Sequence, residues 1–146
     1  MRTLSISRLL SAGVLAWTAA AALPAHAELV VIVSAKSPVN SLRSEQVADI
    51  FLGQIGNFPD GAEAIALDQS IGSPLRDTFY AKVASKSPAL VKAYWTKMIF
   101  TGRGQPPKEL PSSAAVRKQV ADNPNLIGYI DRSALDPSVK AVLVVR

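Results

Sequence analysis

Residues 28–34 have the sequence "ELVVIVS", and this stretch decides the class of fold. After the glutamate, every position up to the final serine is Leu, Val or Ile, with no polar residue alternating between them. A run of this length, rich in β-branched residues, is typical of a strand that is buried on both faces. Such strands belong to parallel or mixed sheets flanked by helices, so the stretch predicts an α/β fold.

The residues that follow this strand predict an amphipathic helix. Residues 37–53, "SPVNSLRSEQVADIFLG", begin with a turn and then place three apolar side chains on one helical face: Val47, Ile50 and Phe51. Ser41 or Ser44 is the expected N-cap, because a serine oxygen can accept a free N–H of the first helical turn. Gly53 is the expected stop.

Strands and helices alternate along the rest of the chain. Ser73-Pro74 and Ser87-Pro88 each predict a helix start, since serine caps a helix and proline fits its first position. Residues 101–113, rich in Gly and Pro, are expected to be irregular, either a plain connection or a functional loop. The other expected elements are strands at residues 64–67, 125–131 and 138–145 and a helix at residues 113–124.

The first 27 residues have the pattern of a secretory signal. Two arginines precede an uncharged run over residues 9–23, and Ala25 and Ala27 supply an A-x-A cleavage site. The alternative is an uncleaved membrane anchor, but the apolar part is short for a span and is interrupted by proline and histidine. The sequence therefore predicts a cleaved signal peptide over residues 1–27, export to the periplasm, and a single domain over residues 28–146.

Cleavage after residue 27 changes the chemistry that the chain offers. The sequence has 146 residues and a net charge of +5, and removing 27 of them leaves 119. Two arginines and the only histidine, His26, leave with the signal, so the net charge falls to +3. With no cysteine in the sequence either, no imidazole base, thiolate, disulfide or Cys/His metal site is expected. The basic residues are scattered, so nucleic acid is not an expected partner.

Motifs of enzymes and cofactor sites are not found in the sequence. Residues 56–62 have the glycine spacing of a Walker loop, but they lack the Lys and Ser/Thr that reach phosphate and metal. Asp60, Glu63 and Asp68 are close in sequence and are expected on the solvated surface. A Ser/His/Asp relay needs a histidine. We therefore expect a protein that is not an enzyme and needs no metal or cofactor.

A turn rich in Gly and Ser stands before the first Ser-Pro helix, in residues 68–79, "DQSIGSPLRDTF". A helix N-terminus exposes free N–H groups and about half a positive charge, so this turn is competent to hold a phosphate, sulfate or carboxylate. The candidate contacts with the anion are Ser70, Gly72, Ser73 and Arg76. The alternative is an ordinary helix start, because Ser87-Pro88 is expected to start a helix with no glycine beside it.

The end of the first strand supplies further candidates for the same site. Ligands of open α/β sheets gather beyond the carboxyl ends of the strands. Ser34, Ala35 and Lys36 follow the first apolar run directly. We therefore expect Ser34 and Lys36 to line the same crevice as the Gly-Ser turn.

Three blocks of the sequence follow one another in a recognisable order: "NSLRSEQVADIFLGQIGNFPDG", "DQSIGSPLRDTFY" and "NPNLIGYID". Together they resemble the substrate-binding proteins of phosphate ABC transporters, in the type II periplasmic binding protein superfamily. The resemblance covers about residues 31–83 and 113–131 and matches a helix, an anion loop and a strand of that family. The family's Ser-Gly-Thr anion loop is replaced here by Gly72-Ser73-Pro74 or by Ser73-Pro74-Leu75.

The resemblance implies an exported solute-binding protein, with a mixed or parallel sheet flanked by helices as in one lobe of a type II periplasmic binding protein. Phosphate or a similar small oxyanion is the implied ligand, and a membrane transporter component is the implied partner. Full-length relatives close two lobes over the ligand, so a second chain, such as another copy in a homodimer, would supply the other wall. The alternative is a periplasmic protein-interaction module that has lost anion binding and presents the loop around Arg103 to a partner.

Overall fold

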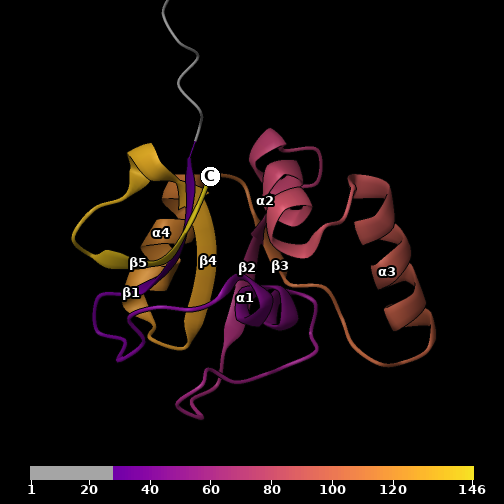
Figure 1. The fold of residues 1–146 in the computed structure, drawn as a ribbon, viewed down its shortest axis with the longest axis horizontal. Helices are drawn as coiled ribbons and strands as arrows, with labels where there is room; N and C mark the ends of the chain where they lie inside the picture. The colour runs from indigo at the N-terminus through magenta and orange to yellow at the C-terminus, as the bar shows by residue number, and fades with distance from the viewer. Residues whose placement is uncertain (1–27) are drawn as a thin grey trace, which may run out of the picture.

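A computed structural model describes residues 28–146 of the chain (Figure 1). The signal peptide expected at residues 1–27 lies outside the described residues. The elements, in chain order, are β1 (Leu29–Ser34), α1 (Ser44–Phe51), β2 (Ile65–Gln69), α2 (Pro74–Ala84), α3 (Pro88–Phe100), β3 (Lys108–Leu110), α4 (Ser113–Asp122), β4 (Leu126–Asp131), the 3₁₀-helix η1 (Arg132–Ala134) and β5 (Val139–Val145).

The strands form one mixed sheet with the order β3-β2-β4-β1-β5. β2 pairs in parallel with β3 and β4, whereas β1 is antiparallel to both of its neighbours, β4 and β5. The predicted α/β class with a mixed sheet is therefore confirmed. Because β1 runs in the opposite direction to β2 and β4, its carboxyl end lies beside the amino ends of those strands.

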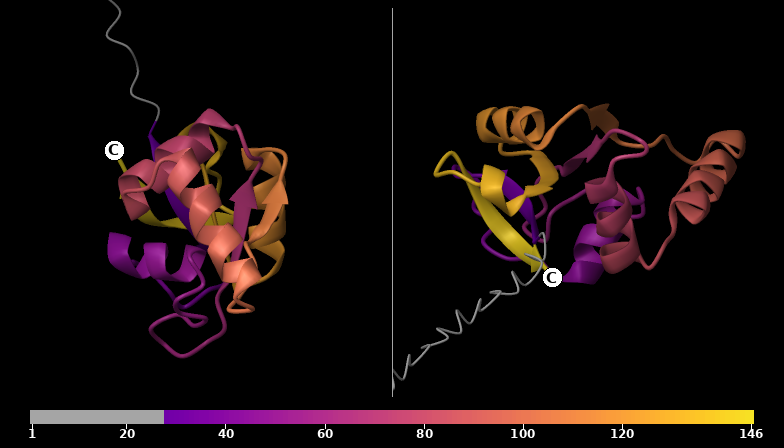
Figure 2. Two further views of the ribbon diagram at one scale, coloured as in Figure 1. Left: turned by 90° about the vertical axis from the view of Figure 1, so that its right-hand side faces the viewer. Right: turned by 90° about the horizontal axis from the view of Figure 1, so that it is seen from above.

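Helices cover both faces of the sheet, as the two views of Figure 2 show. Successive side chains of β1 point to opposite faces. Val30 and Ile32 belong to the core under α4, together with Val116 and Val120 of that helix. The other face of the sheet packs against α1 and α2 in a larger core, to which β1 contributes Leu29, Val31 and Val33.

Gly128 in the middle of β4 lets α4 approach the sheet closely. A Cβ atom at this position would collide with the side chain of Val116 and would contact Val120. The glycine is therefore needed for its size and not for a special backbone angle, since only a bare Cα fits under the helix.

The predicted helix starts are confirmed at α2 and α3 and are partly wrong at α1. Ser73 and Ser87 each accept the N–H of the residue three positions later, and the prolines occupy the first helical turn. In α1 the buried residues are Val47, Ile50 and Phe51, as predicted, and Gly53 follows the helix with φ of +70°. However, neither Ser41 nor Ser44 caps α1: the N-cap is Arg43, whose N–H donates to Gln46 Oε1 at 2.8 Å.

Two strands differ from their predictions. β2 extends to Gln69, so Asp68 belongs to the strand and is 1% exposed, and its predicted place on the solvated surface is wrong. β3 lies within residues 101–113, which were expected to be irregular. Its three residues, "KEL", are too few and too polar to predict a strand from the sequence. They form a strand only by pairing with β2.

α3 lies beside α2 and away from the sheet (Figures 1 and 2). Only Val91 and Trp95 of this helix are buried, and Phe100 at its end is 90% exposed. α3 therefore forms the outer wall of the space between itself and α2.

Candidate anion site at the start of α2

The turn between β2 and α2 is a tight loop of four residues. Ser73 N–H donates to the carbonyl oxygen of Ser70 at 3.0 Å and closes the loop. Gly72 has φ of +89°, a left-handed conformation that glycine adopts without strain. The local sequence therefore folds as expected, and Ser70, Gly72 and Ser73 are brought together.

The cap of α2 uses several of the N–H groups that a helix start offers. Ser73 Oγ accepts the N–H of Arg76 at 3.4 Å, and the Ser73 carbonyl oxygen accepts the N–H of Asp77 at 3.1 Å. Pro74 has no N–H. In the described part of the chain, no hydrogen bond uses the N–H of Gly72 or Leu75. These two N–H groups and the hydroxyl of Ser73 are the donors left for a ligand.

Glu109 of β3 places a carboxylate directly at this turn. Its Oε1 accepts the N–H of Ile71 at 2.8 Å. The hydroxyl of Ser70 donates to the carbonyl oxygen of Leu110 at 3.4 Å. The prediction of the site missed Glu109, because the residue reaches the turn only through the parallel pairing of β3 with β2.

Arg76 is buried and faces a carboxylate of its own chain. Its Nε lies 3.4 Å from Asp68 Oδ2, and the residue is 7% exposed. The guanidinium belongs to a residue that lines the cleft beside the turn, but its charge is balanced by Asp68. The positive potential at the turn therefore comes mainly from the backbone of α2.

Asp68 is held by a network of buried donors. Its Oδ2 accepts the hydroxyl of Tyr80 at 2.6 Å, and its Oδ1 accepts the hydroxyl of Tyr129 and, at 2.8 Å, the N–H of Gln69. Burial, followed by the charge and hydrogen bond of Asp68, raises the pKa of Tyr80 and of Tyr129 far above the usual range. Both tyrosines are therefore neutral donors, and the carboxylate has little capacity left for a ligand.

Ser34 and Lys36 do not lie near the turn. They follow β1, which is antiparallel to β4, whereas the turn follows β2, which is parallel to β4. Ser34 is buried and donates to the carbonyl oxygen of Ala121 at 3.0 Å, and Lys36 is exposed. Their predicted place in the same crevice is wrong, because the direction of β1 puts them beside the amino ends of β2 and β4, whereas the turn follows the carboxyl end of β2.

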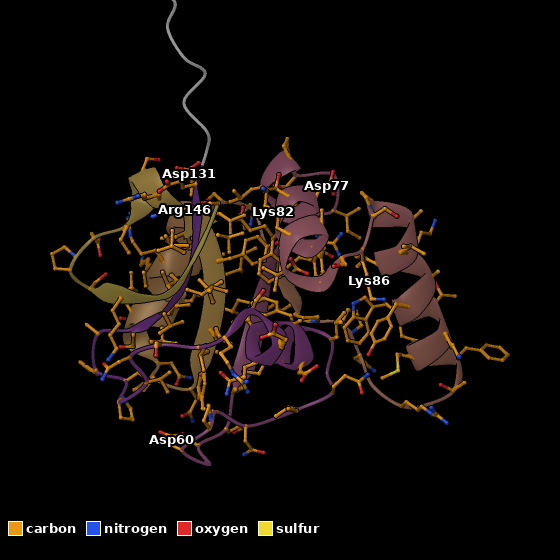
Figure 3. The ribbon with its side chains drawn as sticks, in the orientation of Figure 1. Asp60, Asp77, Lys82, Lys86, Asp131 and Arg146 are labelled. Carbon is orange, nitrogen blue, oxygen red and sulfur yellow. The ribbon has the colours of Figure 1, made fainter. Side chains whose placement is uncertain are left out.

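A cleft of about 520 Å³ extends from the turn into the space between α2 and α3. Ile71 and Gly72 line it at the turn, and Asp77 projects from α2 toward α3 (Figure 3). The far wall is largely apolar and consists of Pro88, Val91, Trp95 and Ile99 of α3 with Pro106 and Pro107. The site is therefore a small polar turn that opens into an apolar cleft.

Two buried donors on side chains that line this cleft have no hydrogen-bond acceptor within residues 28–146. They are Nε of Arg76, which has only its ion pair with Asp68, and Nε1 of Trp95. Buried polar groups without a partner are uncommon and require an explanation. Both nitrogen atoms are covered by the surrounding protein, so a ligand in the cleft could reach them only after these side chains move.

The described residues contain no cluster of His, Cys, Asp and Glu able to hold a metal ion. Over the same residues, no helix has both the length and the apolar character that a membrane span requires.

The fold is similar to that of several solved substrate-binding proteins. One, from Clostridium perfringens, is described as a phosphate ABC transporter substrate-binding protein with bound phosphate; it has a TM-score of 0.60 and 29% identity over 80% of this chain and 45% of its own. An ABC-type phosphate transport receptor from Vibrio cholerae has a TM-score of 0.62 and 22% identity over 80% of this chain and 46% of its own. No protein-family model matches the chain.

These neighbours are substrate-binding proteins and not enzymes, and the chain spans less than half the length of each. At 22% identity the second similarity concerns the fold alone. The resemblance seen in the sequence is thereby confirmed: the chain has the fold of the phosphate ABC transporter substrate-binding proteins and matches about half of such a protein.

Proposed function

We propose that the chain is an exported, non-enzymatic solute-binding protein that holds a small oxyanion at the turn before α2. The donors are the N–H groups of Gly72 and Leu75 and the hydroxyl of Ser73, with Ser70 and Arg76 at the border. The neighbour that contains phosphate supports an oxyanion as the ligand class. A transporter component, or a second copy of this chain, is the proposed partner.

The observation that carries the proposal is the contact between the turn and Glu109. The N–H of Ile71 already donates to a carboxylate oxygen, at 2.8 Å. One N–H of the turn thus already binds a negatively charged oxygen, two positions before the N-cap Ser73, and the N–H groups of the helix start beside it can bind an anion in the same way.

Calorimetry on the chain with phosphate, sulfate and acetate tests this proposal. Ser73→Ala removes one hydroxyl donor and is expected to weaken binding of each anion by about fivefold, which corresponds to about 1 kcal/mol. Ser87→Ala is the matched control, because it removes the equivalent cap of α3 and no donor of the turn. Absence of heat for every anion, or equal losses in the two variants, would refute the proposal. Export is tested separately by whether the N-terminus of the periplasmic protein is Glu28.

The second candidate function is a protein-interaction module. The exposed side chains of Ile99 and Phe100, next to the loop around Arg103, favour it, because large apolar residues grouped at a surface mark contact sites. This function predicts that the chain binds none of the three anions and that Phe100→Ser reduces binding of a transporter component. Anion binding that is weakened in Ser73→Ala and not in Ser87→Ala would argue against it.

A further inference from the structure

We infer that the ligand of this site is a small zwitterion, an α-amino acid with an apolar side chain, and not inorganic phosphate. The inference rests on the proposed function, because it uses the same oxyanion donors, and it goes further by naming the class of ligand. Three adjoining features carry it: the donors of the turn, the acidic groups beside them, and the apolar cleft beyond.

The acidic groups oppose a ligand that carries only negative charge. Glu109 Oε1 is within hydrogen-bond distance of Ile71 N–H, immediately before the donors of the turn, and Asp77 lines the same cleft. Like charges this close to each other repel. A phosphate dianion at the turn would meet this repulsion, whereas a carboxylate that carries its own ammonium would be attracted through that ammonium.

The geometry of an α-amino acid matches this arrangement. Its ammonium and carboxylate groups are attached to one carbon atom, so they need an anion-binding group and an acidic group side by side. The turn supplies the first through Gly72 and Leu75, and Glu109 supplies the second.

The charges around the cleft give the same preference. Asp68 and Arg76 form an ion pair and balance each other. The remaining charged residues that line the cleft are Asp77, Glu109 and Lys92, which leaves one negative charge in excess. This excess of negative charge favours a ligand with no net charge, or with an exposed ammonium group, over a dianion.

The cleft has the size and the lining to take the apolar side chain of such a ligand. Its volume of about 520 Å³ lies in the range of small-molecule sites. Val91, Trp95 and Ile99 line it from α3, opposite the turn. Nε1 of Trp95 is buried and lacks an acceptor among the described residues, so this wall of the cleft holds an unpartnered donor.

Calorimetry with a series of related compounds tests the inference. L-phenylalanine and L-leucine are expected to bind at least tenfold more tightly than inorganic phosphate. Glycine lacks the side chain, phenylpropionate lacks the ammonium group, and phenethylamine lacks the carboxylate, so each is expected to bind at least fivefold more weakly than L-phenylalanine.

Glu109→Gln is the decisive variant, because glutamine can still accept the N–H of Ile71 but has no charge. It is expected to reduce the preference for L-phenylalanine over phenylpropionate by at least fivefold and to strengthen phosphate binding. Glu63→Gln, which removes an exposed carboxylate of the loop before β2, is the matched control and should change neither.

The possible results separate the inference from the proposed function. Binding of phosphate that equals or exceeds binding of the amino acids overturns the inference and leaves the oxyanion site in place. No binding by any compound overturns both. Amino-acid binding that keeps its preference in Glu109→Gln also overturns the inference, because the ammonium group would then be recognised elsewhere.

Discussion

At the scale of single residues, the buried carboxylate of Asp68 organises the polar groups behind the turn. It accepts hydrogen bonds from Tyr80, Tyr129 and the N–H of Gln69 and forms an ion pair with Arg76. A buried charge is tolerated only when it is paired and hydrogen-bonded. The network therefore fixes the end of β2 and the first turn of α2 relative to each other.

The two tyrosines predict how stability depends on alkaline pH. Their usual pKa is 10.0, and burial and Asp68 raise it in the folded chain. Above pH 10 the unfolded chain thus loses phenolic protons that the folded chain keeps, so the free energy of unfolding falls as pH rises. The expected slope is about 1.4 kcal/mol per pH unit for each tyrosine.

Urea unfolding of the chain and of Tyr80→Phe, between about pH 8 and pH 11, measures this slope. The variant is expected to be about 1–3 kcal/mol less stable at about pH 8, since Asp68 loses a donor, but to have a shallower decline above pH 10. Parallel curves for the two proteins would contradict the assignment of the decline to Tyr80.

The residues of the candidate site were only partly predictable. Ser70, Gly72 and Ser73 lie within four consecutive residues, so local turn and capping preferences are sufficient to bring them together. The partner of Arg76 could not be predicted, because Asp68 was expected at the surface. Glu109 comes from a strand that has no pattern of its own.

At the scale of the elements, the contact of α4 with β4 depends on the absence of a side chain at Gly128. Gly128→Ala is expected to destabilise the protein by about 1–3 kcal/mol, because the added methyl collides with Val116. Val116→Ala, introduced together with it, should restore part of that loss.

Gly56→Ala is the control for this substitution, because the added methyl meets no atom within 4 Å. It is expected to change the free energy of unfolding by less than about 0.5 kcal/mol. Denaturation midpoints compare the four proteins. If the double variant were no more stable than Gly128→Ala alone, Val116 would not be the limiting contact.

Element positions followed from the sequence wherever one local signal was sufficient. The twin Ser-Pro caps and the apolar face of α1 are signals of this kind. The N-cap of α1 was not, because two serines competed in the sequence and the structure uses the backbone of Arg43 with the side chain of Gln46.

At the scale of the whole molecule, the sequence predicted the layers but not the direction of each strand. A run of apolar residues such as β1 indicates that the strand is buried on both faces. The same run of residues is compatible with parallel and with antiparallel neighbours, so it does not indicate the direction of the strand. The pairing of Leu29 with both Asp131 and Val145 makes β1 antiparallel on both sides. Because β1 is antiparallel to β4, Ser34 and Lys36 lie far from the turn. The site is therefore formed by α2, α3 and β3.

The arrangement of α3 predicts that this wall of the cleft opens without unfolding the sheet. α3 buries only Val91 and Trp95, whereas every residue of β1 is buried. Local opening needs less free energy where fewer apolar contacts are lost. Amide hydrogens of α3 are therefore expected to exchange at least tenfold faster than those of β1, and α2, which has the same Ser-Pro start, provides the comparison. If α3 and β1 exchanged with the same protection, α3 would open only with global unfolding and would be a fixed wall, so that a ligand would have to enter a rigid cleft.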